Sequence, residues 1–205
     1  MRAIFSAALA SFATIYSIAA ASGESGHTHS DWHDDDEERP EQCYGIALSD
    51  ASDFGPFQAG ALTGLLKHQE LTGEHYHIVT GVALGAINAY ILATHKPDEI
   101  TETIDMLEKF WIDLATTSPY SNWTGGFIYG FFFEKGIYDM KPMVQYLNDN
   151  FRQRTVHRHL NIAVTNILNG QFSIFDESLP TEDLIRILTA SVSFSGISPA
   201  IEYDN

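Results

Sequence analysis

The sequence predicts an α/β fold, in which short buried strands alternate with helices. Apolar runs at residues 44–48 and 75–80 have the length of buried strands. The first run is followed by Gly55-Pro56, and proline is favoured at the first position of a helix, where its missing N–H costs nothing. The second runs into a glycine-flanked turn and a helix of small residues. Strand and helix therefore alternate from the start of the predicted domain.

The remaining elements are predicted from their caps and their apolar spacing. After Pro97, Asp98 is a good N-cap, and apolar residues then recur at helical spacing as far as Leu114. Glu182 and Asp183 lie in the first turn of another predicted helix, where acids favour the positive end of its dipole. The expected helices cover residues 55–69, 86–93, 98–114, 143–151 and 181–190, and the expected strands cover residues 44–48, 75–80, 160–165 and 171–175.

The charge of the chain excludes one class of function. Lys and Arg number 11 against 27 Asp and Glu, which gives a net charge of −16 over 205 residues. Such a chain repels nucleic-acid phosphates and anionic membrane surfaces. Cys43 is the single cysteine, so neither an internal disulfide nor a cysteine-based zinc site can form. We expect one acidic globular domain without a nucleic-acid partner.

The N-terminus has the pattern of a secretory signal. Residues 1–21 combine Arg2, a weakly apolar stretch and the small-residue cleavage site Ala19-Ala20-Ala21. A cleaved signal peptide is the preferred interpretation, and an uncleaved anchor is the alternative. Asn122 begins a glycosylation sequon that would suit a chain in the secretory pathway. The expected localisation is therefore secreted or within the secretory pathway.

Residues 22–43 are predicted to be an acidic linker that precedes a domain at residues 44–205. Like charges repel, and the segment has almost no apolar content to pack. Its side chains also offer a second interpretation, because His27, His29, His33 and Asp34 have the ligand chemistry of a Zn²⁺ or Cu²⁺ site. The linker is preferred, so no metal is assigned.

The strongest motif is Gly81-Val82-Ala83-Leu84-Gly85, a strand-to-helix turn with the spacing of a nucleophile elbow. With the following Ala86-Ile-Asn-Ala89, it closely resembles the elbow of the patatin-like phospholipases. The chain is similar to that family in further segments, in family order: 47–49 with 58–62, Gly136-Ile-Tyr-Asp139 with Pro142, 160–166 with Gly170, and 190–199.

The resemblance implies a three-layer α/β/α sandwich and lipid acyl hydrolysis by a Ser–Asp dyad, with no cofactor and no essential metal. It also implies an oxyanion hole made by backbone N–H groups of a glycine-rich loop. The family's catalytic Asp lies in a D-G-[GA] turn after the segment that ends here at Asn205. We therefore expect a domain that is incomplete at its C-terminus.

The chain departs from the family at the residues that carry the chemistry. Ala83 stands at the nucleophile position, and its methyl group cannot attack a carbonyl. The three glycines of the oxyanion loop fall on Asp50, Ala51 and Ser52, and only the last glycine is kept, as Gly55. A carboxylate at residue 50 would repel the negative charge of the transition state.

These departures predict a pseudo-hydrolase of lipid metabolism that acts by binding a lipid, an acyl chain or a protein partner. The alternative is an active lipid acyl hydrolase that uses an unassigned serine, of which Ser52 is the foremost, or whose motifs were lost through a gene-model error. The other serines considered are Ser49, Ser191, Ser193 and Ser195.

An aromatic, glycine-interrupted stretch follows at residues 120–133. It offers three interpretations: the lining of an acyl pocket, a membrane-interface contact, or a satellite core under a long loop, which is preferred. The residues assigned to the acyl pocket are Tyr120, Trp123, Phe127 and Phe131.

Overall fold

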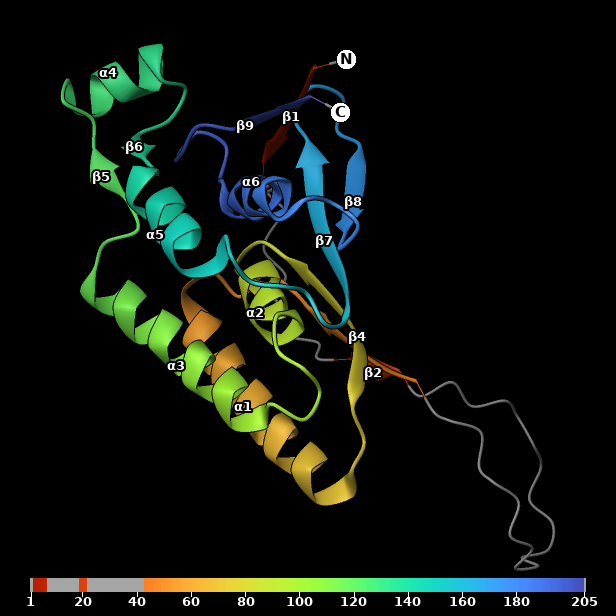
Figure 1. The fold of residues 1–205 in the computed structure, drawn as a ribbon. Helices are drawn as coiled ribbons and strands as arrows, with labels where there is room; N and C mark the ends of the chain where they lie inside the picture. The colour runs from red at the N-terminus through yellow and green to blue at the C-terminus, as the bar shows by residue number, and fades with distance from the viewer. Residues whose placement is uncertain (1, 7–18, 22–42, 205) are drawn as a thin grey trace, which may run out of the picture.

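The computed structural model describes residues 2–6, 19–21 and 43–204 (Figure 1). The predicted signal peptide falls partly on two strands, β1 (Arg2–Ser6) and β2 (Ala19–Ala21), and partly outside the described residues. Residues 22–42 of the predicted linker, with its candidate metal ligands, also lie outside them. Both assignments stay predictions.

A seven-stranded mixed sheet forms the centre of the fold, in the order β2-β3-β4-β7-β1-β9, with β8 paired to β7. Strands β3, β4 and β7 are parallel to one another, while the other pairings are antiparallel. The strands not yet given bounds are β3 (Tyr44–Leu48), β4 (Tyr76–Val82), β7 (His159–Asn166), β8 (Phe172–Asp176) and β9 (Ile201–Asp204).

Five of the six helices in the described residues lie where the sequence predicted them, and the helix at residues 126–133 was not predicted. The 3-10 turn η1 (Ser52–Phe54) precedes α1, and a small two-stranded sheet of β5 (Ser121–Asn122) and β6 (Tyr138–Asp139) brackets α4. The helices are α1 (Gly55–Thr72), α2 (Leu84–Ala93), α3 (Ile100–Thr116), α4 (Gly126–Phe133), α5 (Lys141–Phe151) and α6 (Thr181–Val192).

The core lies between the sheet and one layer of helices (Figure 1). Helix α2 is buried from Gly85 to Ala93, as expected of a helix that is apolar on every face. It packs against β4 and is flanked by α1, α3 and α6. On the opposite face of the sheet, Ile78 of β4 and Ile174 of β8 are exposed. The α/β class predicted from the sequence is confirmed, and the described residues show one of its helical layers.

The register of the parallel strands positions the elbow. Leu48 at the end of β3 is paired with Gly81, and Gly81 is paired with Ile162 of β7. The loop after β3 and the turn after β4 therefore leave the same edge of the sheet. In open α/β sheets, ligands bind at the carboxyl ends of parallel strands.

Candidate functional site

The elbow keeps its backbone geometry although its central side chain is alanine. Ala83 joins β4 to α2 with φ 52° and ψ −131°, in the left-handed half of the backbone map. A non-glycine residue in such a conformation costs on the order of 1–3 kcal/mol, so the surrounding structure must hold it. The Ala86 N–H donates to the Ala83 carbonyl at 2.9 Å and closes the turn.

Close packing explains both glycines of the elbow motif. A Cβ added at Gly81 would lie 2.5 Å from the Ala86 Cα, and one added at Gly85 would overlap the carbonyl oxygen of Ser49. The second contact also shows that the elbow lies directly against the loop that follows β3. The elbow and this loop are therefore in direct contact.

The side chain of Ser191 links the elbow to β7 through two hydrogen bonds. Its hydroxyl accepts the Ala83 N–H at 2.8 Å and donates to the Ala163 carbonyl of β7 at 3.0 Å. Ser191 is fully buried near the end of α6. With both interactions made, this hydroxyl ties three elements together, so its role is structural. The sequence singled out Ser191 only as a candidate nucleophile, because nothing in it shows a partner 108 residues away.

The loop after β3, on which the resemblance places the oxyanion-loop positions Asp50, Ala51 and Ser52, uses three of its N–H groups internally. The Ser52 N–H donates to Asp50 Oδ1 at 2.9 Å. The Phe54 N–H donates to the Ala51 carbonyl at 2.7 Å, and the Gly55 N–H donates to the Ser52 carbonyl. These bonds build η1, and Ser52 takes φ 39° within it. Three N–H groups of the loop are thus engaged by the loop itself.

Ser52 has an acidic partner that the sequence analysis did not identify. Its Oγ donates to Asp50 Oδ2 at 3.0 Å, so a Ser–Asp pair lies on the loop beside the elbow. The same arrangement recurs on the surface turn after β8, where both the N–H and the hydroxyl of Ser178 donate to Asp176. Local Asp-x-Ser hydrogen bonding is a common turn motif. The pair at residues 50 and 52 is therefore explained by turn formation.

A chain of buried polar side chains fixes the base of this loop. The Trp111 indole N–H donates to Asn88 Oδ1 at 2.9 Å, and the Asn88 amide donates to Gln58 Oε1 at 2.8 Å. The Gln58 amide then donates to the Ser49 carbonyl at 3.1 Å. Gly55 packs directly on the Trp111 ring, where a Cβ would overlap the indole. Gly55 is thus required by its packing against Trp111.

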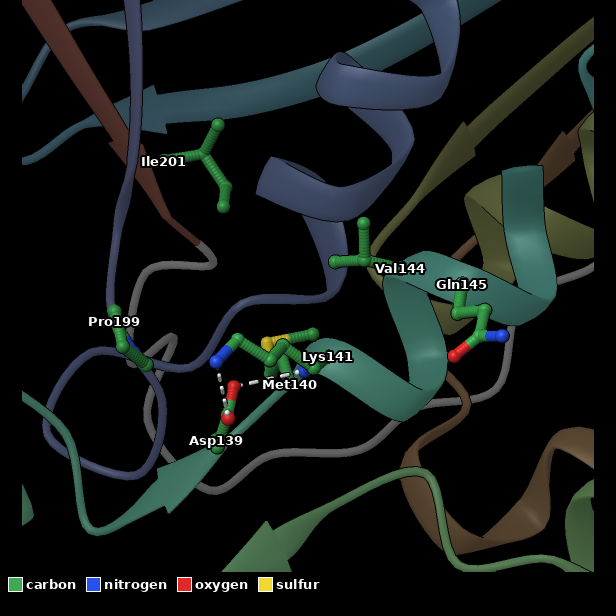
Figure 2. A pocket seen from close by; sticks show the side chains of 7 residues that line it. All are labelled: Asp139, Met140, Lys141, Val144, Gln145, Pro199 and Ile201. Carbon is green, nitrogen blue, oxygen red and sulfur yellow. Dashed lines mark hydrogen bonds and ion pairs between the residues drawn. The ribbon is translucent and has the colours of Figure 1, made fainter. Parts of the chain in front are cut away.

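An apolar cleft lies between α5 and the segment that leads into β9, beside α6, the helix that carries Ser191 (Figure 2). It has a volume of about 410 Å³ and is lined by Asp139, Met140, Lys141, Val144, Gln145, Pro199 and Ile201. The Lys141 N–H donates to Asp139 Oδ1 at 2.9 Å, and the Lys141 Nζ lies 3.6 Å from Oδ2. This charged pair borders an otherwise apolar cleft.

Two of the segments that carry the family resemblance meet at this cleft. Gly136 and Gly196 form a parallel bridge, and the Tyr138 N–H donates to the Ile197 carbonyl at 2.8 Å. Met140 forms part of the cleft lining, and its sulfur lies 3.4 Å from the Ser193 hydroxyl. The cleft lining therefore contacts the end of α6 two residues after Ser191, whose hydroxyl accepts the Ala83 N–H.

The four aromatic residues assigned to an acyl pocket do not line this cleft. Tyr120 packs against the core near η1; burial raises the pKa of its phenol, and the charge of Asp53 raises it further. Trp123 is half-buried and donates its indole N–H to the Gly136 carbonyl at 3.0 Å. Phe127 and Phe131 are exposed on α4, so the preferred interpretation of a satellite core is wrong for this helix.

The structure adds three further observations on sites. Asn122 of the glycosylation sequon is exposed on β5, and glycosylation stays a prediction. Among the described residues, no group of three His, Cys, Asp or Glu side chains could hold a metal ion. Within the same residues, no helix combines the length and the apolar character that a membrane crossing requires.

A protein-family model described as "Patatin-like phospholipase" matches residues 54–205, which is most of the chain. A search of curated proteins finds no match. The matched range begins at the end of η1 and includes both the elbow and the cleft.

Proposed function

Because the chain belongs to the patatin-like phospholipase family, we propose that it is a catalytically silent relative that binds a lipid acyl chain without cleaving the ester. The observation that carries this proposal is Ala83 in the intact elbow geometry. A methyl group has no lone pair with which to attack a carbonyl carbon, so no acyl-enzyme can form at this position.

The loop supports the same conclusion independently. Oxyanion stabilisation needs N–H donors aimed at the position where negative charge develops. Here three of the loop's N–H groups donate within the loop, and one of them donates to the Asp50 carboxylate. That carboxylate also carries the same sign of charge as an oxyanion. Removing one such donor costs about 10²–10³ in kcat in serine hydrolases, so this loop would be a poor catalyst even beside a serine.

Binding is supported by the cleft. Its volume of about 410 Å³ lies within the range of small-molecule sites, and its lining is largely aliphatic. A single acyl chain fits such a lining, and the Asp139–Lys141 pair at the border can contact a polar head group. Entry into the secretory pathway through residues 1–21 remains part of the proposal.

Covalent labelling separates this proposal from an active hydrolase. A fluorophosphonate probe forms an adduct with an activated serine, and we expect no adduct on the purified full-length protein. Turnover of a soluble p-nitrophenyl ester should equal the rate without protein. An adduct that disappears in Ser52→Ala would instead establish the active-hydrolase alternative and overturn the proposal.

The variant Ala83→Ser tests the contribution of the loop. Serine can take the place of alanine at the elbow, yet we expect ester turnover to stay at background, because the loop donors remain engaged by their own partners. The double variant Ala83→Ser/Ser52→Ala controls for a contribution of the loop serine. Recovery of turnover in Ala83→Ser would show that the loop still stabilises an oxyanion.

A further inference from the structure

Helix α4 exposes an apolar surface that the described part of the chain does not cover. Of its eight residues, Gly130 is the one that is buried. Its large side chains are all exposed: Phe127, Ile128, Tyr129, Phe131, Phe132 and Phe133. Figure 1 shows the helix at the far end of the molecule from α1, beyond β5 and β6. A helix that is apolar all round is normally buried, so α4 is expected to be covered by something other than the described residues.

Contacts of Trp123 and Gly136 with Gly130 attach the helix to the rest of the domain. Gly130 packs on the ring of Trp123, whose indole N–H donates to the Gly136 carbonyl at 3.0 Å. The Gly136 N–H donates back to the Gly130 carbonyl at 3.2 Å. Gly136 in turn lies against Pro199, where a Cβ would come within 2.6 Å of the proline nitrogen. The helix is therefore fixed to the domain next to the segment that borders the cleft, and its apolar side chains are left pointing outward.

The size of α4 argues against a folded protein as the partner. Six exposed side chains of this kind offer on the order of 700 Å² around the helix. A flat protein surface contacts one side of a helix, or about half of that area. Stable interfaces bury roughly 800 Å² on each partner, so such a contact would be too small. A lipid layer, in contrast, can surround an inserted helix on every side except the one at Gly130 that rests on Trp123.

The length and charge of α4 define the kind of lipid contact. At about 1.5 Å per residue, eight helical residues extend about 12 Å, which reaches into one leaflet and cannot span the hydrocarbon core. The helix has no charged residue, and Glu134 and Lys135, which follow it, have opposite charges. With a net charge of −16, the chain as a whole is repelled by anionic lipids. An uncharged helix on an acidic protein is complementary to a surface without net charge.

We propose that α4 docks the protein on a zwitterionic lipid surface such as phosphatidylcholine, by inserting its aromatic side chains at the level of the head groups. Helices that lie at a membrane surface bury Phe side chains at the boundary between head groups and acyl chains, and Tyr is enriched at the same interface. The inference goes beyond acyl-chain binding in the cleft, because it concerns attachment to a lipid surface and requires neither a bound ester nor catalysis.

Flotation with phosphatidylcholine vesicles tests the docking. The full-length protein should float with the vesicles, and raising the salt concentration should not release it, because no charge pairing holds it there. The variant Phe132→Ser/Phe133→Ser should lower the partition coefficient at least about tenfold, since two aromatic side chains no longer enter the lipid. Leu168→Ser/Phe172→Ser is the matched control, because these β7–β8 hairpin side chains are 64% and 62% exposed, comparable with 73% and 72% for the α4 pair.

A fluorescence measurement locates the inserted segment. In Phe132→Trp, the added emission should shift to the blue on vesicle addition and be quenched by brominated phosphatidylcholine, whereas Phe172→Trp should show neither change. Unchanged circular dichroism and urea midpoints establish that each variant is folded.

Each of the other outcomes overturns the proposal. Absence of flotation shows that α4 does not dock on this lipid. Binding that requires anionic lipid and is lost at high salt assigns the contact to charge. Equal loss in the control variant assigns it to another surface, and a dimer that dissociates in the α4 variant makes a second copy the occupant. None of these results bears on the proposed function, which is measured with soluble ester and no vesicles.

Discussion

Replacing Ser191 by alanine should destabilise the protein, although no catalytic role is assigned to this serine. The variant removes the acceptor of the Ala83 N–H and the donor to the Ala163 carbonyl, at a side chain that is fully buried. A buried polar group left unpaired costs about 1–3 kcal/mol, and the second bond contributes about 1 kcal/mol. The free energy of unfolding should therefore fall by about 2–4 kcal/mol, a large share of the 5–15 kcal/mol typical of a domain.

Urea denaturation followed by circular dichroism measures this loss, with Ser195→Ala as the control. Ser195 is exposed, so its replacement should change the free energy by less than about 0.5 kcal/mol. A double-mutant cycle with Ala83→Gly adds a sharper readout. Glycine keeps the backbone N–H that the Ser191 hydroxyl accepts, so Ser191→Ala should cost the same in that background to within about 0.5 kcal/mol. A loss below 0.5 kcal/mol in either background would refute the role given to Ser191.

Two further predictions concern the packing of the elbow and a buried histidine. Gly85→Ala should lower the free energy of unfolding by at least about 3 kcal/mol, because the added Cβ would overlap the Ser49 carbonyl. Gly60→Ala, in open space on α1, should raise it by about 0.5–1 kcal/mol. Similar effects of the two variants in urea denaturation would contradict the close packing of Gly85. The pKa of His95 is lowered chiefly by burial and also by the charge of Arg154, so the folded state binds its proton less readily than the unfolded state does. Stability should therefore be lost as the pH falls below about 6.5, the usual histidine value. His95→Gln should reduce the change in urea midpoint between pH 7.5 and pH 5.5. If that change stays as large as in the unaltered protein, another group is responsible for it.

The elements that sequence could predict are those marked by local chemistry. Proline at the start of α1 and the two glycines of the elbow each meet a local requirement, either a free first-turn position or contact with a neighbouring backbone. Such signals are visible in a few consecutive residues. The alternation of strands and helices followed from them, and the structure confirms it.

The parts that sequence did not reveal depend on contacts between distant residues or on exposure. Ser191 reaches the elbow across 108 residues, so its role appears only in the folded chain. The aromatic stretch that includes α4 was expected to be a satellite core under a long loop, because its run of aromatics shows no periodic polar face and apolar residues are usually buried. The Asp50–Ser52 contact is local, and the Asp-x-Ser spacing was the signal that could have predicted it.

Native mass spectrometry of the full-length protein with a soluble single-chain lipid ester tests whether the protein binds an ester without cleaving it. We expect a complex at the mass of the protein plus one intact ester, with no fatty acid released. Val144→Trp, which fills the cleft, should lose that complex. Release of fatty acid, or an acyl group covalently attached to the chain, would show that the protein is a working hydrolase whose nucleophile lies elsewhere than residue 83.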